Sequence, residues 1–212
     1  MSSMKSVALS VFHLAARVRV PLVAGVALLS VNLGGCVAAL FGAGATTGVT
    51  VVQERSVGSA LDDSAIQIAV QGKMIDHSGK LFLNVATEVD EGRVLLTGVV
   101  RKTEDRVAAA RIAWDTNGVA EVLNEIQVTD KSGIINYTKD AWITTKLRTK
   151  MLGDSKIAGI NYTIETVNAV VYLLGVAQDA TELKRVTEHA RNIGDVAEVV
   201  SHVRYKDDPR RH

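Results

Sequence analysis

The sequence has little of several things that other classes of protein need. It has one cysteine, two prolines and 4% aromatic residues, and its 24 Lys and Arg nearly balance 23 Asp and Glu. A single cysteine excludes an internal disulfide and a zinc site built from several cysteines. The near-neutral charge argues against a generic nucleic-acid binder, so we expect no nucleic acid as a partner. The charged fraction of 22% excludes a multi-span membrane protein, and the hydrophobic fraction of 47% is enough for a folded core.

The N-terminal residues have the pattern of an export signal. Residues 1–19 contain three basic residues and no acid, and residues 20–33 are almost wholly apolar or small and carry no charge. This apolar run is too short to cross a bilayer, which takes about 20 residues. A basic segment followed by a short apolar segment is typical of a secretory signal.

The only cysteine stands at the end of that signal. Leu33-Gly34-Gly35-Cys36 resembles the bacterial lipobox. The resemblance implies that residues 1–35 are removed and that Cys36 is acylated. Because Gly and small residues at 40–48 suit a flexible tether, we expect residues 36–57 to form a lipidated N-terminus and flexible tether. Several acyl chains give a stable membrane anchor. Two alternatives stay open: Cys36 is a buried thiol, or a standard peptidase cuts at 43–45 and discards it. By resemblance to lipoprotein sorting signals, Val37 in place of Asp implies the outer membrane, with the protein facing the periplasm.

The remainder of the chain consists of two copies of one repeated unit. A shift of 77 residues aligns residues 63–126 with 140–203 without a gap, and it places Val119-Ala120-Glu121-Val122 on Val196-Ala197-Glu198-Val199. A run of identities in one continuous register indicates a duplication. We therefore expect two small domains, at 58–129 and 130–206, followed by a tail at 207–212.

Each copy shows the pattern helix, strand, strand, helix, strand. We expect Asp62 or Asp63 to cap a first helix that runs to about Ile75. The other elements expected are strands 81–89 and 94–100, helix 104–116 and strand 119–128, then helices 139–152 and 179–193 with strands 160–166, 169–176 and 196–205. Two helices on one face of a three-stranded mixed sheet form a two-layer sandwich of the α+β class.

This arrangement resembles a known family. Gly98 and Gly175 close the second strands, and the repeated Val-Ala-Glu-Val opens the third, as in BON domains. With the lipobox and the run of residues 140–146, DAWITTK, the chain resembles the dual BON-domain outer-membrane lipoproteins of the DolP type. The resemblance implies a non-enzymatic protein on the inner leaflet of the outer membrane. It also implies that the second domain binds anionic phospholipid and that the protein supports envelope integrity and division-site processes.

The two copies differ in charge. Residues 36–130 hold 8 basic and 13 acidic residues, for a net −5, whereas residues 131–212 hold 13 and 10, for a net +3. At about 100° per residue, one side of the second copy's first helix carries a tryptophan, a threonine and three lysines. These residues are Lys139, Trp142, Lys146, Thr149 and Lys150. We expect Ile143, Leu147 and Met151, on the adjacent side, to face the sheet.

An indole beside ammonium groups suits a membrane interface, where the ring lies at headgroup level and lysines pair with phosphate. We therefore predict a site for anionic phospholipid, phosphatidylglycerol or cardiolipin, at these five positions. The alternatives are that Trp142 packs in the core or between the domains, and that the lysines form an ordinary solvated face. We expect Trp114 to pack in the core or between the domains, because an Ala-rich helix leaves volume to fill.

Nothing in the sequence supports catalysis. The histidines are scattered without metal-binding spacing, and neither a nucleophile elbow nor a phosphate-binding loop is present. We expect no enzyme, no metal and no cofactor. Two functions remain open: a lipid-binding envelope lipoprotein, or an adaptor that docks other envelope proteins, with lipid contact incidental and the acidic first domain as its partner surface.

Overall fold

The computed structural model describes residues 56–129 and 137–211, so Cys36, the signal region, most of the tether and the linker at 130–136 lie outside the described residues. The first domain contains α2 (Val57–His77), α3 (Gly79–Asn84), β1 (Val85–Asp90), β2 (Arg93–Val100), α4 (Thr103–Trp114), β3 (Glu121–Asn124) and β4 (Gln127–Val128). The second contains α5 (Tyr137–Leu152), β5 (Tyr162–Val167), β6 (Val170–Ala177), α6 (Ala180–Arg191) and β7 (Glu198–Tyr205). Short 3-10 helices cover Gly159–Asn161 and Pro209–Arg211.

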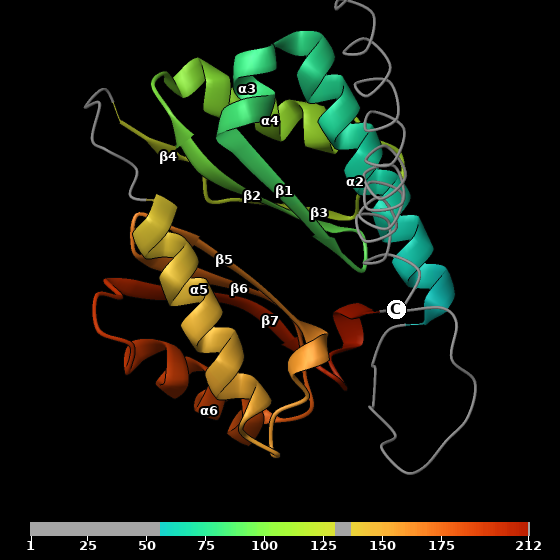
Figure 1. Ribbon diagram of the computed structural model, residues 1–212. Helices are drawn as coiled ribbons and strands as arrows, with labels where there is room; N and C mark the ends of the chain where they lie inside the picture. The colour runs from blue at the N-terminus through green and yellow to red at the C-terminus, as the bar shows by residue number, and fades with distance from the viewer. Residues whose placement is uncertain (1–55, 130–136, 212) are drawn as a thin grey trace, which may run out of the picture. The chain divides into compact units, whose positions relative to one another are not determined.

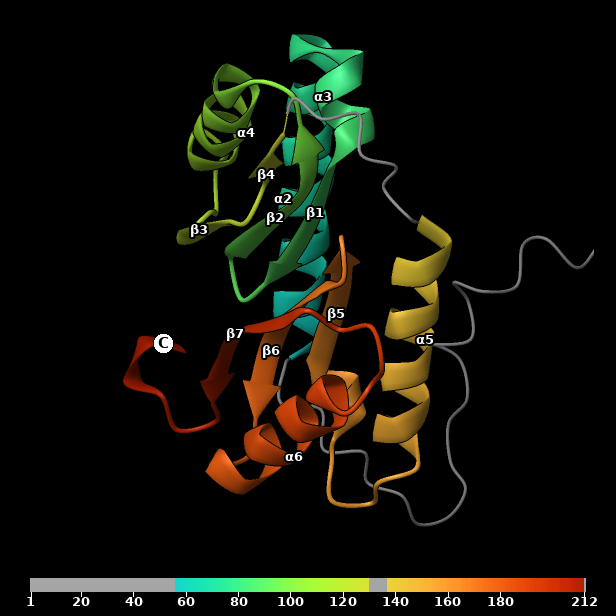
Figure 2. The same ribbon diagram turned by 90° about the vertical axis from the view of Figure 1, so that its left-hand side faces the viewer.

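Each domain has the predicted α+β architecture, two helices on one face of a mixed sheet (Figure 1). In the first domain β1 runs antiparallel to β2, and β3 and β4 run parallel to it. In the second domain β5 is antiparallel and β7 is parallel to β6 (Figure 2). The buried side chains Val70 and Met74 of α2 and Ala109 and Ala113 of α4 pack on Val94 and its neighbours in the sheet.

The first domain departs from the sequence prediction at the start of α2. The helix begins at Val57, and its cap is Ser56, whose Oγ accepts a hydrogen bond from the N–H of Ser59 at 3.0 Å. Capping by Asp62 or Asp63 was therefore a wrong prediction. Asp63 is buried instead, and its carboxylate accepts hydrogen bonds from the backbone N–H groups of Glu91 and Gly92 at 2.9 and 2.8 Å. It fastens the turn between β1 and β2 to the helix.

Two further elements differ from the prediction. The segment 81–84 continues a short helix, α3, because the side chain of Ser78 caps it by accepting from the N–H of Leu81. The first strand consequently begins at Val85. The third strand is divided into β3 and β4, since the side chain of Asn124 accepts from the N–H of Ile126. Ile126 then turns into the core, where it is buried.

The structure repeats with the same shift of 77 residues as the sequence. The pairing of Val85 with Gly98 recurs as Tyr162 with Gly175. Asp140 accepts from the N–H groups of Asn168 and Ala169 at 2.9 and 2.8 Å, as Asp63 does in the first domain. Gly98 and Gly175 have φ of +123° and +129°, and a Cβ at either would lie about 2 Å from a backbone oxygen of the neighbouring strand connection. Only glycine fits both demands.

The sheet faces that carry no helices are also buried. Leu95 of β2 and Tyr172 and Leu174 of β6 form a third apolar cluster, made from both domains. Polar contacts surround it: Arg204 donates to Glu121 at 2.8 Å, and the ring Nε2 of His202 lies 2.9 Å from Glu125. Residues 50–212 therefore form one compact unit in which sheet packs on sheet.

Candidate functional site

The predicted lipid-binding residues lie on α5, whose rotation about its own axis is fixed by its core contacts. Ile143, Leu147 and Met151 are buried against the sheet, which confirms the predicted core face. Asp140, on the same side, is bound to the turn between β5 and β6. The opposite and flanking sides of the helix are consequently presented to solvent.

Trp142 lies on that outward side. Its side chain is 45% exposed, and the Nζ of Lys146 lies 4.4 Å from the centroid of its ring. A cation over an indole face is attracted by the ring quadrupole, more strongly when the pair loses water. Trp142 is therefore not a buried core residue, and its ring is paired with one of the predicted lysines.

The other predicted side chains are held by neighbours within the domain or are partly buried. The Nζ of Lys139 forms a salt bridge at 3.2 Å with Asp195, which lies in the loop that follows α6. The hydroxyl of Thr149 donates to the carbonyl of Thr145 within the helix at 2.9 Å. Lys150 is half-buried at the edge of the core face. Trp142 and Lys146 are therefore the members of the predicted set that project most clearly from the domain.

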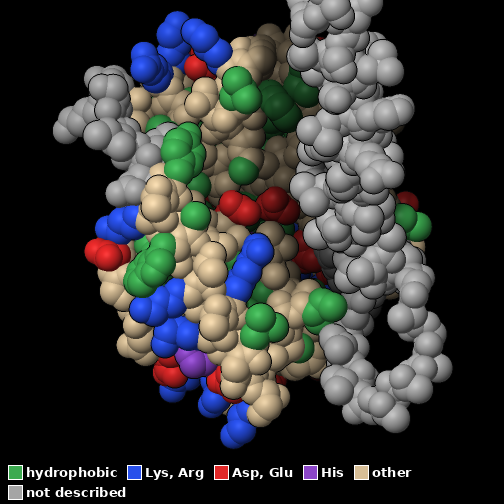
Figure 3. Space-filling model, viewed as in Figure 1, with side chains coloured by type: hydrophobic (Ala, Val, Ile, Leu, Met, Phe, Trp, Pro, Cys, Tyr) green, Lys and Arg blue, Asp and Glu red, His purple; other side chains and the backbone are tan. Residues whose placement is uncertain are grey.

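The structure adds a residue that sequence reasoning missed. Leu152, the last residue of α5, is 84% exposed. Trp142, Thr145, Thr149 and Leu152 follow one another at spacings of three, four and three residues, so they form one continuous ridge. Figure 3 shows hydrophobic and basic side chains side by side over α5. The helical spacing from Trp142 would have been enough to find Leu152.

Asp154 holds the loop that follows this ridge. Its carboxylate accepts from Arg185 of α6 at 2.6 Å and lies 3.0 Å from the Nε2 of His189. The hydrogen bonds from His189 and Arg185 lower the pKa of Asp154 to about 2. The carboxylate is therefore ionised at any physiological pH, and it ties the C-terminal end of α5 to α6.

Comparison with known proteins identifies the family of this chain. The sequence profile of the BON domain matches residues 62–130 and again residues 139–207. The chain belongs to the BON-domain family. Outer membrane lipoprotein DolP of Haemophilus influenzae is 30% identical over 179 residues, 84% of this chain and 92% of that protein. With its two domains in tandem, this is a dual BON-domain protein of the DolP type.

Two other relatives align with this chain over most of their own length. An uncharacterized protein of the gshII 5' region of Anaplasma centrale is 37% identical over 147 residues, 69% of this chain and 96% of that protein. Osmotically-inducible protein Y of Escherichia coli strain K12 is 27% identical over 152 residues, 71% of this chain and 76% of that protein.

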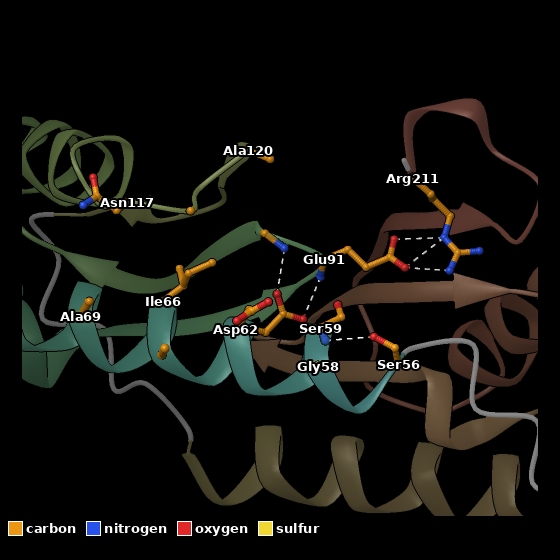
Figure 4. A pocket seen from close by; sticks show the side chains of 14 residues that line it. Ser56, Gly58, Ser59, Asp62, Ile66, Ala69, Glu91, Asn117, Ala120 and Arg211 are labelled. Atoms are coloured by element: carbon orange, nitrogen blue, oxygen red, sulfur yellow. Dashed lines mark hydrogen bonds and ion pairs between the residues drawn. The ribbon is translucent and has the colours of Figure 1, made fainter.

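The two BON domains differ on the outward side of the first helix and in the loop that follows the second helix. Ala65, Ala69 and Gly118 of the first domain correspond, at the shift of 77, to Trp142, Lys146 and Asp195. The small residues leave a shallow hollow of about 1150 Å³ beside α2, shown in Figure 4. At one end of it the carboxylate of Glu91 binds the guanidinium of Arg211 at 2.7 Å. The second domain has an indole and a lysine where the first has open space.

Trp114 does not lie where the sequence predicted. It is 55% exposed, so the expected packing in the core or between the domains is wrong. The reason is the alanine face of α4: Ala109 and Ala113 are buried and bring the helix close to the sheet. That close approach removes the volume that a large side chain would have filled, and Trp114 projects outward beside Ala113.

Within the described part of the chain, His, Cys, Asp and Glu side chains do not gather in groups of three that could hold a metal ion. Across residues 56–129 and 137–211 we find no helix with the length and apolar character needed to cross a bilayer.

Proposed function

We propose that this protein is a non-enzymatic lipoprotein of the bacterial envelope that binds anionic phospholipid through α5 of its second BON domain. Cys36 anchors it in the outer membrane, with both domains in the periplasm, and its role is to maintain envelope integrity, including at the division site. The observation that carries the proposal is the outward position of Trp142 with Lys146 over its ring. The DolP relative, named an outer membrane lipoprotein, supports the location.

The ridge on α5 has the chemistry of a membrane interface. Trp142 and Leu152 supply apolar surface at the two ends of the ridge, and Lys146 supplies a cation between them. An amphipathic helix of this kind lies at the headgroup boundary. Each lysine near an anionic surface contributes about 1 kcal/mol. The salt bridge with Asp195 compensates Lys139, so Lys146 and Lys150 together give about 2 kcal/mol.

The lipid anchor would strengthen this weak binding. A contribution of about 2 kcal/mol corresponds to about a 30-fold gain in affinity, which is modest for a free protein. Acylation at Cys36 would hold the domain beside the bilayer and raise the effective concentration of headgroups, so a weak contact becomes populated. The anchor thus provides the membrane residence and α5 provides the choice of lipid.

The chain contains its own control for a binding experiment. Its two tryptophans are both exposed on helices, Trp142 on α5 and Trp114 on α4. Residues 50–212 would be titrated with vesicles of phosphatidylglycerol and, separately, of phosphatidylcholine. We expect binding to phosphatidylglycerol vesicles only, a loss of at least about tenfold in Trp142→Ala, and no change in Trp114→Ala. Equal behaviour of the two variants would refute the proposed site.

Fluorescence gives a second readout of the same site. Trp114→Phe leaves Trp142 as the only tryptophan, and Trp142→Phe leaves Trp114. We expect the emission of Trp142 to shift to shorter wavelength with phosphatidylglycerol vesicles, because the ring leaves water. The emission of Trp114 should stay where it is. Binding that requires another envelope protein, with neither emission shifted by vesicles, would support the adaptor function instead.

The salt bridge between Lys139 and Asp195 predicts whether a change of charge raises or lowers vesicle binding. Asp195→Asn removes the carboxylate of this salt bridge and with it a negative charge beside the site, so this variant should bind phosphatidylglycerol vesicles several-fold more tightly at low salt. Lys146→Glu should weaken binding, because it reverses a charge beside the ridge. Both effects should shrink as salt is raised, since ions screen the exposed charges.

Mass spectrometry tests the proposed anchor at Cys36. Protein extracted from membranes should lack residues 1–35 and carry acyl groups on Cys36. Cys36→Ser should keep the signal segment and add no acyl mass. Acyl-free protein that begins at residue 44 or later would show cleavage by a standard peptidase and refute the anchor.

A further inference from the structure

The two BON domains contact each other near both ends of β2. At the far end of the strand, Val99 pairs with Gln127 of β4. The Oε1 of Gln127 accepts a hydrogen bond at 2.8 Å from the Nδ2 of Asn168, which lies in the turn between β5 and β6. Because β4 ends at Val128, this is also the end from which the chain leaves the first domain.

The beginning of β2 meets the tail that follows β7. There the carboxylate of Glu91, in the turn before β2, accepts from the Nε and Nη2 of Arg211 at 3.0 and 2.7 Å (Figure 4). From Arg93 to Val100 the strand rises about 23 Å, at about 3.3 Å per residue. The contact of Glu91 and that of Gln127 therefore lie near opposite ends of the strand.

An apolar cluster lies between these two contacts. Leu95 of β2 is fully buried with Tyr172 and Leu174 of the second domain, although it lies on the sheet face that carries no helices. Its neighbour Val94 points to the other face and is buried in the core of the first domain. Separation of the two sheets would therefore expose Leu95 and leave Val94 covered.

The two end contacts differ in charge. Gln127 and Asn168 are uncharged, whereas Glu91 and Arg211 form an ion pair whose side chains are only 15% and 7% exposed. A charge that is withdrawn from water and loses its partner is strongly disfavoured. If the sheets part, both charges regain water. The closed arrangement consequently depends on the ion pair being intact.

Glu91 has a backbone conformation that glutamate rarely adopts. Its φ is +53°, and Asn168, the corresponding residue at the shift of 77, has a φ of +51°. Asparagine tolerates this left-handed region, but a long side chain such as glutamate is uncommon there. A residue held in a sparsely populated conformation points to a function for its side chain. In the first domain that side chain binds Arg211.

We propose that the ion pair of Glu91 and Arg211 is the latch of a hinged pair of domains, that is, the contact that must break before the domains part. The sheets separate at the Glu91 end, and the Gln127 end is the hinge. Release of the latch exposes the apolar cluster around Leu95, and Arg211 is the positioning residue that keeps it covered. The latch includes no residue of the α5 ridge, so this inference does not rest on lipid binding.

Thiol labelling measures the opening, since residues 50–212 contain no cysteine. Leu95→Cys reports separation of the sheets, and Leu174→Cys reports it from the second domain, whereas Val94→Cys reports unfolding of the first domain. Both interface positions should be labelled faster than Val94→Cys and with a weaker dependence on urea, because parting the sheets exposes less surface than unfolding does. Equal rates with equal urea dependence would show that the sheets part only on unfolding, and the proposal would fall.

The latch itself is tested in the Leu95→Cys protein. Arg211→Ala should raise the labelling rate by at least about tenfold, because it leaves the carboxylate of Glu91 unpaired in the closed arrangement. Arg210→Ala is the matched control on the same tail, since Arg210 is exposed and pairs with Asp208 of the tail itself. It should leave the rate unchanged. Equal effects of the two arginine variants, or no effect of Arg211→Ala, would overturn the proposal.

Glu91→Asn separates the latch from the turn that carries it. Asparagine suits the positive φ, as Asn168 does in the second domain, so the variant should keep the turn and lose the latch. It should raise labelling at Leu95→Cys as Arg211→Ala does, and the two changes together should give no further rise, because both remove one contact. A double variant whose effect equals the product of the single effects would show that the two residues act separately, which contradicts the latch.

Discussion

Glu88 provides the sharpest test of the contact between the two sheets. It lies on β1 opposite Leu95, and Glu165 lies on β5 opposite Tyr172, so both carboxylates share the sheet faces that form the third apolar cluster. Burial, reinforced by the charge of Glu165, raises the pKa of Glu88 to about 7, although the guanidinium of Arg148 opposes the rise. Burial also raises the pKa of Glu165.

The sign of the effect on stability follows from linkage. In the unfolded chain the carboxyl of Glu88 ionises near its ordinary pKa of 4.5, whereas in the folded protein it stays protonated to about 7. The folded state therefore holds the extra proton between these values, and stability falls as the pH rises through that window. At about 1.4 kcal/mol per pH unit the upper bound is about 3 kcal/mol. Because Glu88 is partly exposed, screening by solvent reduces this to about 1–2 kcal/mol.

The change to make is Glu88→Gln, which keeps the shape and removes the ionisation. We expect the variant to match the unmodified protein near pH 5 and to be more stable by about 1–2 kcal/mol near pH 8, measured by urea unfolding of residues 50–212. Glu188→Gln, an exposed change on α6, should leave the pH dependence unchanged. An unaltered slope between about pH 5 and pH 7 in Glu88→Gln would refute the assigned burial.

Three other results are expected. Gly98→Ala should lose about 3 kcal/mol or more in thermal unfolding, because the added Cβ meets a carbonyl oxygen at a positive φ, whereas Gly79→Ala, with open space around it, should be nearly neutral. Asp63→Ala should cost about 2–4 kcal/mol by leaving two backbone N–H groups of the hairpin without their acceptor, while the exposed neighbour Asp62→Ala should cost far less. Leu152→Ser should weaken binding to phosphatidylglycerol vesicles by about tenfold without lowering stability, since the side chain is exposed. Stable Gly98→Ala, a harmless Asp63→Ala or unchanged vesicle binding in Leu152→Ser would each contradict the corresponding contact.

Local pattern was enough to predict most of the architecture. The periodicity of apolar residues indicated the core face of α5, and the structure buries Ile143, Leu147 and Met151 as expected. The gapless repeat implied that both domains share one fold, and the strand pairings recur with the same shift. These features depend on contacts within one element or between identical units, so a sequence contains them directly.

The errors lie where a residue could serve either a local or a distant partner. An aspartate near a helix start is a good cap, but Asp63 has its acceptors filled by a hairpin 28 residues away. Alanines in α4 indicated spare volume, but the helix moves closer to the sheet and Trp114 is left outside. Which partner prevails depends on distances that only the packed domain defines.

The sequence by itself determined the signal pattern, the duplication, the uneven charge of the two halves and the placing of Trp142 on a helix face, because each follows from composition or from spacing along the chain. The tertiary structure decided which of the charges are available. It pairs Lys139 with Asp195 and leaves Lys146 on the indole of Trp142. It also decided that the open faces of the two sheets pack together, because two apolar faces exclude more water together than apart. Availability and burial are properties of neighbours in space, and those neighbours come from segments far apart in the sequence.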